Sequence, residues 1–139
     1  MLLISMVWGC SEGTKDGHEF TRRERIELQQ YYVAGERLYA QHCGNCHMPE
    51  GEGLGRLIPP LKGTDFMERD SLLACIIKNG LSGEIEVNGV VYNQPMPGIP
   101  QLTNIEIAQI TTYLYKEFFD KDVLLKPSAI EQMLSECEP

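Results

Sequence analysis

CGNCH, the stretch from Cys43 to His47, has the spacing C-x-x-C-H, and the rest of the chain is interpreted from it. Two thiols at this spacing can add across the vinyl groups of one haem and hold it through thioether bonds. His47 directly follows the second cysteine, so its imidazole is held beneath the iron. The stretch therefore predicts one covalent haem c, attached through Cys43 and Cys46, with His47 as an iron ligand.

Composition and charge limit the classes of partner. The chain has 139 residues, of which 42% are apolar, and this suits one domain with a modest core. Its formal charge of −8 comes from 12 basic and 20 acidic residues. The sequence has no basic cluster of the kind that binds nucleic acid. The acidity favours solubility, and it can also steer the protein toward a basic docking patch on a redox partner.

The N-terminus resembles an export signal. The apolar run from Leu2 to Trp8 is too short to span a membrane, and a polar stretch follows it. VWGC, residues 7–10, resembles a bacterial lipobox, in which the cysteine is lipidated; a plain secreted leader is the alternative. We expect a leader over residues 1–9 and a flexible tether over residues 10–20. The protein would then be exported to the periplasmic face of a bacterial membrane and anchored by lipid at Cys10.

Two capping boxes predict the helices at the ends of the core. Thr21 with Glu24 starts the first helix, and Thr103 with Glu106 starts the last core helix. Apolar residues recur at helical spacing after each box, and the first stripe runs directly into the haem motif. The two stripes are Leu28, Tyr31, Tyr32, Gly35, Leu38, Tyr39 and His42 in the first helix, and Ile107, Ile110, Leu114 and Phe118 in the last.

The segments between these helices are predicted from their turn signals. Residues 48–63 and 93–100 are rich in Gly or Pro and are expected to be loops without regular structure. Asp70 is expected to cap a helix that ends at Asn79-Gly80, with Leu72, Leu73, Ile76 and Ile77 as its buried face. Asn88-Gly89 lies within an alternating pattern from Glu84 to Tyr92, which predicts a β-hairpin.

The C-terminal segment is predicted to be an extension. We expect one domain over residues 21–120 and an extension over residues 121–139. Ser128 and Glu131 form a third capping-box pattern, which predicts a short terminal helix. This helix is expected to pack on its own domain, and a contact with another subunit is the alternative.

Met96 is the candidate for the second iron ligand. A methionine thioether is soft and is an established partner of histidine on haem iron. Met48 is adjacent to His47 and cannot reach the opposite face of the haem, and Met67 is more simply explained by packing. Met96 lies between two prolines in an extended loop, with enough chain after His47 to cross the haem edge and return on its far face.

Two cysteines outside the haem motif and the leader have open roles. Cys75 lies in an apolar helical pattern and is most simply a small buried hydrophobe. A disulfide between Cys75 and Cys137 is possible outside the cytoplasm. The sequence does not distinguish these two interpretations.

With these motifs in place, residues 31–119 resemble a class I monohaem cytochrome c. GERLY, residues 35–39, is similar to the family's first helix, in which a glycine lets the last helix cross closely and an aromatic residue packs on it. The match implies that Gly35 and Tyr39 lie against Ile110 and Tyr113.

Further residues of the haem site come from the same resemblance. IPPLKG, residues 58–63, is similar to the segment in which a proline carbonyl accepts a hydrogen bond from the iron-binding histidine. The match implies that Pro59 orients His47 and that Leu61 lines the haem face. Residues 87–97 resemble the family's methionine loop in a variant with a hairpin insertion. This match adds Tyr92 to the haem-binding residues and supports Met96 as the second ligand.

The resemblance also implies a fold and a function. The expected fold is all-α, with three to five helices around a covalent haem and a small hairpin before the methionine loop. The expected function is electron transfer between membrane or periplasmic redox proteins, without catalysis and without a small-molecule substrate. A fixed haem subunit of a larger dehydrogenase or terminal oxidase is the alternative.

Two other functions remain as rivals. In an enzyme or gas sensor, Met96 would be displaced by a small ligand, but the sequence places no distal His or Arg to activate oxygen or peroxide. In a zinc or thiol–disulfide module, His42, Cys43, Cys46 and His47 would be the reactive groups. Ligands this close in sequence lack the paired spacing of common structural zinc sites.

Overall fold

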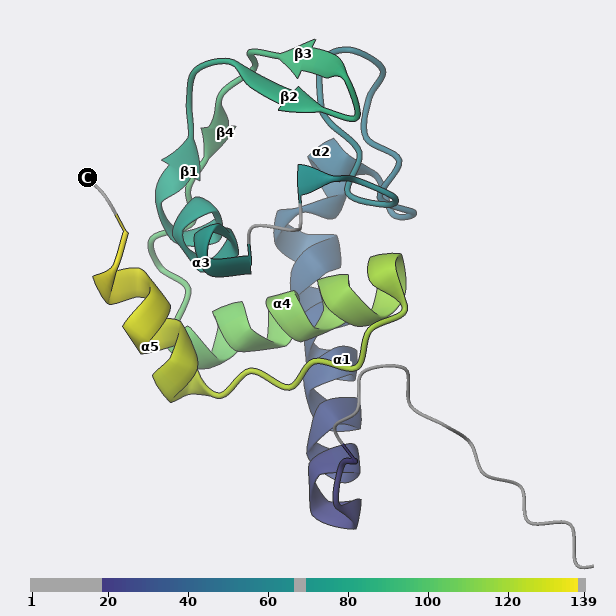
Figure 1. The fold of residues 1–139 in the computed structure, drawn as a ribbon, viewed down its shortest axis with the longest axis vertical. Helices are drawn as coiled ribbons and strands as arrows, with labels where there is room; N and C mark the ends of the chain where they lie inside the picture. Colours follow the sequence, from purple (N-terminus) through teal and green to yellow (C-terminus); the bar gives the residue numbers. More distant parts are fainter. Residues whose placement is uncertain (1–18, 67–69, 138–139) are drawn as a thin grey trace, which may run out of the picture.

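The computed structural model describes residues 19–66 and 70–137, and Figure 1 shows their arrangement. The predicted leader (residues 1–9), Cys10, residues 11–18 of the tether and Met67 lie outside the described residues. The described helices are α1 (Arg22–His42), α2 (Gly44–His47), α3 (Asp70–Asn79), α4 (Asn104–Phe119) and α5 (Pro127–Ser135). The strands form two antiparallel pairs, β1 (Gly80–Leu81) with β4 (Met96–Pro97) and β2 (Ile85–Val87) with β3 (Val90–Tyr92).

Both predicted capping boxes of the core helices are confirmed. In α1 the Glu24 N–H donates to Thr21 Oγ1 at 3.2 Å, and the Thr21 N–H donates to Glu24 Oε2 at 2.9 Å. In α4, Thr103 and Glu106 make the same reciprocal pair. Each box satisfies backbone donors that have no partner inside the helix, so both helices begin where the sequence indicates.

The core forms where α1 and α4 cross (Figure 1). A Cβ added to Gly35 would lie 2.1 Å from the Gln109 carbonyl oxygen and 2.7 Å from the Tyr113 Cβ. The rings of Tyr39 and Tyr113 pack beside this contact with centroids 5.2 Å apart. The backbones can therefore approach this closely only because residue 35 is a glycine.

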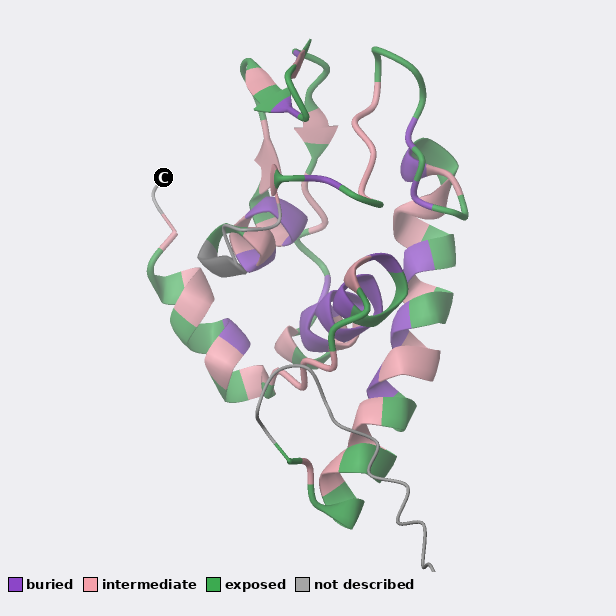
Figure 2. Ribbon diagram, turned by 45° about the vertical axis from the view of Figure 1, so that its right-hand side comes forward, coloured by how far each residue is buried: buried purple, intermediate pink, exposed green. Residues whose placement is uncertain are grey.

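Burial is concentrated on α4, which lies between α1 and α3 (Figure 2). The four residues of its predicted stripe, Ile107, Ile110, Leu114 and Phe118, are all buried, as expected. Ile110, which the resemblance placed against α1, belongs to the same core cluster as Tyr39 and also contributes to the lining of a cavity. The atoms of α4 nearest to Gly35 belong to Gln109 and Tyr113.

The predicted hairpin is present and has the expected turn. Asn88 and Gly89 both have positive φ, 51° and 74°, as a two-residue turn between twisted strands requires. Asn88 also fixes the ribbon to the preceding loop. Its N–H donates to Asp65 Oδ1 at 2.9 Å, and its Oδ1 accepts from the Asp65 N–H at 3.0 Å.

The structure corrects two expectations about α3 and the methionine loop. Asp70 is already helical, so it does not occupy the cap position, and Leu72 is 41% exposed, outside the buried face. The loop over residues 93–100 contains a short strand, because Met96–Pro97 pairs with Gly80–Leu81. Proline is compatible with a two-residue pair at an edge, where one side of the strand needs no donor.

The C-terminal extension forms α5, but not with the predicted cap. The helix begins at Pro127, and the cap position is Lys126, whose side chain makes no capping bond. A proline at the first helical position sets φ for the helix and needs no N–H partner, so it overrides the Ser128 signal. The helix packs on its own domain through Ile130, which is fully buried.

Cys75 and Cys137 form a disulfide with Cα atoms 5.7 Å apart. It joins α3 to the residues that follow α5. The interpretation of Cys75 as a simple buried hydrophobe is therefore wrong. Spacing along the chain could not reveal the pair, because the two cysteines are 62 positions apart.

Candidate functional site

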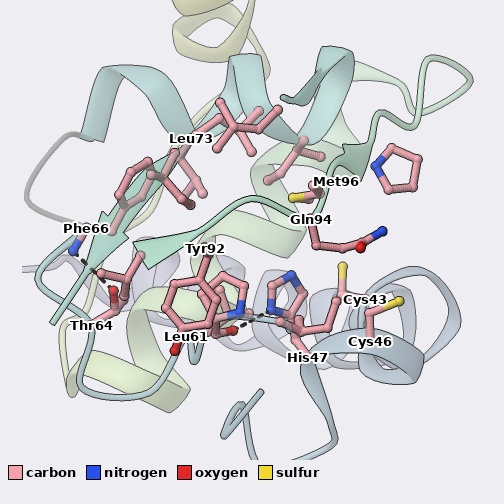
Figure 3. Close-up of a pocket in the computed structure, with 18 of the residues that line it drawn as sticks. Cys43, Cys46, His47, Leu61, Thr64, Phe66, Leu73, Tyr92, Gln94 and Met96 are labelled. Carbon is pink, nitrogen blue, oxygen red and sulfur yellow. Dashed lines mark hydrogen bonds between the residues drawn. The ribbon is translucent and has the colours of Figure 1, made fainter. Parts of the chain in front are cut away.

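A cavity of about 320 Å³ opens beside the CGNCH stretch (Figure 3). Its walls come from the end of α1, from α2, from the loop over residues 58–66, from α3, from both strand pairs and from α4. Most of the lining side chains are apolar. The volume lies within the roughly 300–1,000 Å³ of small-molecule and cofactor sites.

Cys43 and Cys46 lie side by side at one edge of the cavity (Figure 3). The helical turn of α2 sets their spacing, because the amides of Cys46 and His47 both donate to the Cys43 carbonyl oxygen, at 3.1 and 2.9 Å. Both are free thiols; Cys46 is exposed and Cys43 is half-buried. Burial raises the pKa of Cys43 to about 11, with a smaller contribution from the charge of Cys46.

His47 is buried at the base of the cavity. Its Nδ1 lies 3.1 Å from the Pro59 carbonyl oxygen. A carbonyl can only accept, so Nδ1 carries the proton and Nε2 keeps its lone pair for a metal. Burial lowers the pKa of the imidazole, while the hydrogen bond to Pro59 opposes that shift. The ring is therefore neutral and held in one orientation.

Met96 approaches the cavity from the side opposite His47. Figure 3 shows its sulfur and the His47 ring directed toward one another across the open space. Met96 reaches this position because β4 pairs with β1, with Leu81 as its partner in the register. Its side chain is half-buried.

Leu61 and Tyr92 complete the set of predicted site residues. The Leu61 N–H donates to the Gly51 carbonyl oxygen at 2.8 Å, which fixes the loop that carries it. Tyr92 is buried at the end of β3, and its hydroxyl donates to the Gly55 carbonyl oxygen at 3.4 Å. One cavity thus brings together all seven predicted residues, which are Cys43, Cys46, His47, Pro59, Leu61, Tyr92 and Met96.

The sequence did not predict the wall of the cavity that α3 and the β2–β3 ribbon form. Leu73, Ile76 and Ile77 of α3 were predicted only as a buried face, yet they line the site together with Ile85 and Val87 of the ribbon. Their pattern could not show this, because an apolar stripe has the same spacing whether it faces a core or a cofactor.

The residues present fit a haem. A large apolar cavity has two thiols at its edge, an imidazole on one side and a thioether on the other, which is the donor set of a covalent His/Met haem. Across residues 19–66 and 70–137, no three His, Cys, Asp or Glu side chains are grouped to hold a metal ion.

Comparison with known proteins gives a family and two groups of relatives. The model of the cytochrome c family matches residues 32–116. A cytochrome c-552 of Thermus thermophilus is 31% identical over 106 residues, covering 71% of this chain and 80% of the relative. A second cytochrome c-552, from a particular strain of the same species, is also 31% identical and covers 71% of both chains.

A longer relative is the cytochrome c subunit of the quinone-dependent alcohol dehydrogenase of Gluconobacter oxydans. It is 30% identical over 87 residues, which cover 60% of this chain but 18% of the relative. The similarity therefore concerns one segment of that larger subunit. Separately, no helix among the described residues has the length and apolar character needed to cross a membrane.

Proposed function

Since this chain belongs to the cytochrome c family as a class I monohaem member, we propose that it is an exported carrier in which His47 and Met96 bind the haem iron. The family places the chain in electron transfer and gives it one haem c, bound covalently through Cys43 and Cys46. When bound, haem c supplies an iron that alternates between the ferrous and ferric states.

The proposal rests on one observation: the neutral imidazole of His47 and the thioether of Met96 lie on opposite sides of one apolar cavity. Nε2 of His47 and the sulfur of Met96 would both bind the iron. A filled second position leaves no site for a substrate on the iron. We therefore assign the chain to carriers without catalysis and without a small-molecule substrate.

The chain's own residues would set the properties of the site. Pro59 holds the His47 ring, and Leu61, Tyr92 and the apolar wall of α3 line the cavity, where they would keep water from the bound haem. A dry pocket and a thioether ligand both disfavour the extra positive charge of ferric iron. These features support a fairly high reduction potential.

Export and lipid anchoring form a separate part of the proposal. The sequence of residues 1–10 supports a leader followed by a lipidated Cys10. The Cys75–Cys137 disulfide supports an oxidising compartment such as the periplasm, because disulfides rarely persist in the cytoplasm. In cells that express the full chain, Cys10→Ala should abolish the lipid on residue 10, measured as loss of the added acyl mass. An unmodified cysteine at the N-terminus of the mature wild-type protein would contradict the anchor.

We propose that the redox partners present a basic patch. Glu50 and Glu52 follow the haem motif, and Glu84 and Glu86 lie on or beside β2; all four are exposed. Attraction to a basic partner is screened by salt, so the rate of electron transfer to a small cationic oxidant should fall as ionic strength rises. An anionic oxidant of similar potential serves as the control and should show the opposite trend.

A second candidate is a fixed haem subunit of a larger dehydrogenase or oxidase. The match to a dehydrogenase cytochrome subunit favours it. A gently solubilised membrane extract distinguishes the two. A carrier should elute at a size near its own 15.7 kDa plus detergent, whereas a subunit should co-elute with a larger redox protein.

The central test combines potentiometry with ligand binding. The haem-loaded protein should titrate as one reversible one-electron couple and show the sulfur-to-iron charge-transfer absorption when oxidised. Its reduced form should resist carbon monoxide at neutral pH. Rapid stoichiometric binding of carbon monoxide would contradict Met96 as the second ligand and favour an enzyme or sensor.

A further inference from the structure

α3 connects the haem cavity with the C-terminal extension. Leu73, Ile76 and Ile77 line the cavity from one face of the helix. At 100° per residue, Cys75 lies on the opposite face, where it bonds to Cys137. One face of α3 therefore lines the cavity, and the other face carries the disulfide to Cys137.

The extension is held at both of its ends. We name residues 126–137 the C-terminal strap. At its start, Lys126 Nζ lies 2.6 Å from Glu27 Oε2 of α1, and in its middle Ile130 is fully buried in the core. At its end, the disulfide joins it to α3. The strap thus ties α3 to α1 and to the core around α4.

The C-terminal end of α3 holds the chain on both sides of Met96. Leu81, just after the helix, pairs with Met96 in the β1–β4 register. The Ile99 N–H donates to the Ile77 carbonyl oxygen at 3.0 Å. Lys78 Nζ donates to the Pro100 and Leu102 carbonyl oxygens at 2.7 and 2.6 Å.

Two glycines, Gly80 and Gly98, let the backbone at the end of α3 approach the backbone around Met96 very closely. A Cβ on Gly98 would lie 2.4 Å from the Asn79 carbonyl carbon, and a Cβ on Gly80 would lie 2.5 Å from the Met96 carbonyl oxygen. Backbones this close, bonded on either side, move together. A shift of α3 therefore displaces Met96 by a similar amount.

We propose that Cys75 and Cys137 are positioning residues for Met96, and that their disulfide keeps the thioether sulfur over the cavity by holding α3 against the core. The inference rests on the proposed ligation by Met96. Opening the disulfide removes the covalent end of the strap. The end of α3, with the Met96 segment attached, then opens more often while α1 and α4 stay folded.

Carbon monoxide binding to the ferrous protein tests the proposal without a mutation. Ascorbate reduces the haem and leaves the disulfide closed. In a second sample a phosphine opens the disulfide: the phosphine becomes its oxide with oxygen from water, and both sulfurs leave as thiols. The thiols are alkylated and the reagents are removed before titration, so that the phosphine cannot bind iron and the disulfide cannot close again.

We expect the apparent affinity for carbon monoxide to rise about tenfold when the disulfide is open, which corresponds to about 1.4 kcal/mol. Equal affinity in the two samples, with opening verified by mass, would overturn the positioning role and leave the ligation by Met96 intact. Tight binding while the disulfide is closed would instead refute Met96 as a ligand, and the inference with it.

Hydrogen exchange gives a readout that does not use the iron. The Ile99 amide bonds to α3, whereas the Ile107 amide bonds to the Thr103 carbonyl oxygen in α4. Opening the disulfide should accelerate exchange at Ile99 more than at Ile107, whose exchange reports only the loss of global stability. Equal acceleration at both amides would indicate a general loss of stability and contradict the proposal.

Two variants extend the test. Cys75→Ala/Cys137→Ala should reproduce the tenfold gain in carbon monoxide affinity in protein matured without the disulfide. Lys126→Met removes the ion pair at the other end of the strap but keeps the covalent link to α3. It should retain the affinity of the unmodified protein; a gain equal to that of the double variant would show that the disulfide has no specific role.

Discussion

At the scale of single residues, one backbone carbonyl, one thioether and one glycine define the site and the core contact. The Pro59 carbonyl gives His47 one tautomer and one orientation. Met96 supplies the sulfur that faces it. Gly35 has no side chain, and this lets α1 and α4 approach closely. Met96 and Gly35 can each be tested by a substitution that changes little else.

Met96→Leu should open the second axial position while it preserves the volume of the side chain. Loss of the thioether removes a ligand that favours ferrous iron, so the midpoint potential should fall and the charge-transfer absorption should disappear. Potentiometric titration with spectra of the oxidised protein measures both. Met48→Leu is the matched control, because Met48 is next to His47 and cannot reach the other side; an equal fall in both variants would contradict the assignment.

Gly35→Ala should destabilise the fold by about 1–3 kcal/mol, as expected when a methyl group enters a packed contact. The added Cβ would lie 2.1 Å from the Gln109 carbonyl oxygen, so α1 and α4 would have to separate. Denaturant unfolding measures the change. Gly44→Ala is the control, since its Cβ would have its nearest neighbour at 3.5 Å; a loss of stability as large as that of Gly35→Ala would refute the steric argument.

At the scale of elements, helix ends decide where the site is placed. The capping box of α4 fixes the start of the helix that supplies Ile110 and Leu114 to the cavity. The hairpin is placed by its turn and by the Asn88–Asp65 bonds. β4 is placed by β1 and by the end of α3. The site is thus assembled mainly from ends of elements.

The capping box of α4 should give an acid-sensitive contribution to stability. Hydrogen bonds from the Thr103 hydroxyl, and then from its N–H, lower the pKa of Glu106 below 4.5. Because the folded-state pKa lies below the unfolded value, this contribution is present above about pH 4.5 and is lost as pH falls through the folded pKa. The carboxyl is exposed, so solvent screening keeps the effect small.

Glu106→Gln keeps an acceptor for the box but removes the titrating group. Unfolding between pH 3 and 7, about the range in which a carboxylate titrates, should show a smaller acid-dependent loss than the unmodified chain. Thr103→Val should shrink the same loss, because it removes the hydroxyl that donates to the carboxylate. Acid profiles that coincide for all three proteins would contradict the argument.

At the scale of the whole molecule, a disulfide and a buried helix make the C-terminal extension part of the domain. Cys75–Cys137 closes a loop of 62 residues that contains the hairpin, the Met96 segment and α4. A cross-link of this span restricts the unfolded chain strongly. The extension therefore contributes to stability as well as to the position of α3.

Cys75→Ala/Cys137→Ala should lower the free energy of unfolding by about 4 kcal/mol in the chain-entropy estimate for a loop of this length. Denaturant unfolding of the haem-loaded protein measures the change. Lys126→Met, which removes the exposed ion pair to Glu27, should cost about 0–1 kcal/mol. A double cysteine variant as stable as the unmodified chain would show that the loop is constrained by other means.

The sequence alone determined the haem motif, the capping boxes of α1 and α4, and the hairpin turn. These features rest on local spacing: a C-x-x-C-H stretch, a Thr three residues before a Glu, and an Asn-Gly turn act within a few residues of themselves. The resemblance to class I cytochromes added Pro59, Leu61 and Tyr92 as expected site residues, because each lies within a recognisable segment.

Only the tertiary structure decided the Cys75–Cys137 pair, the β1–β4 pairing, the start of α5 and the lining of the cavity by α3. Contacts between residues distant in sequence depend on how the helices pack, and no local pattern encodes that packing. Leu72 and Leu73 are both apolar, yet packing exposes one and turns the other to the cavity. CGNCH predicts that a haem is attached; the arrangement of α3, the strap and the Met96 segment decides how its far side is closed.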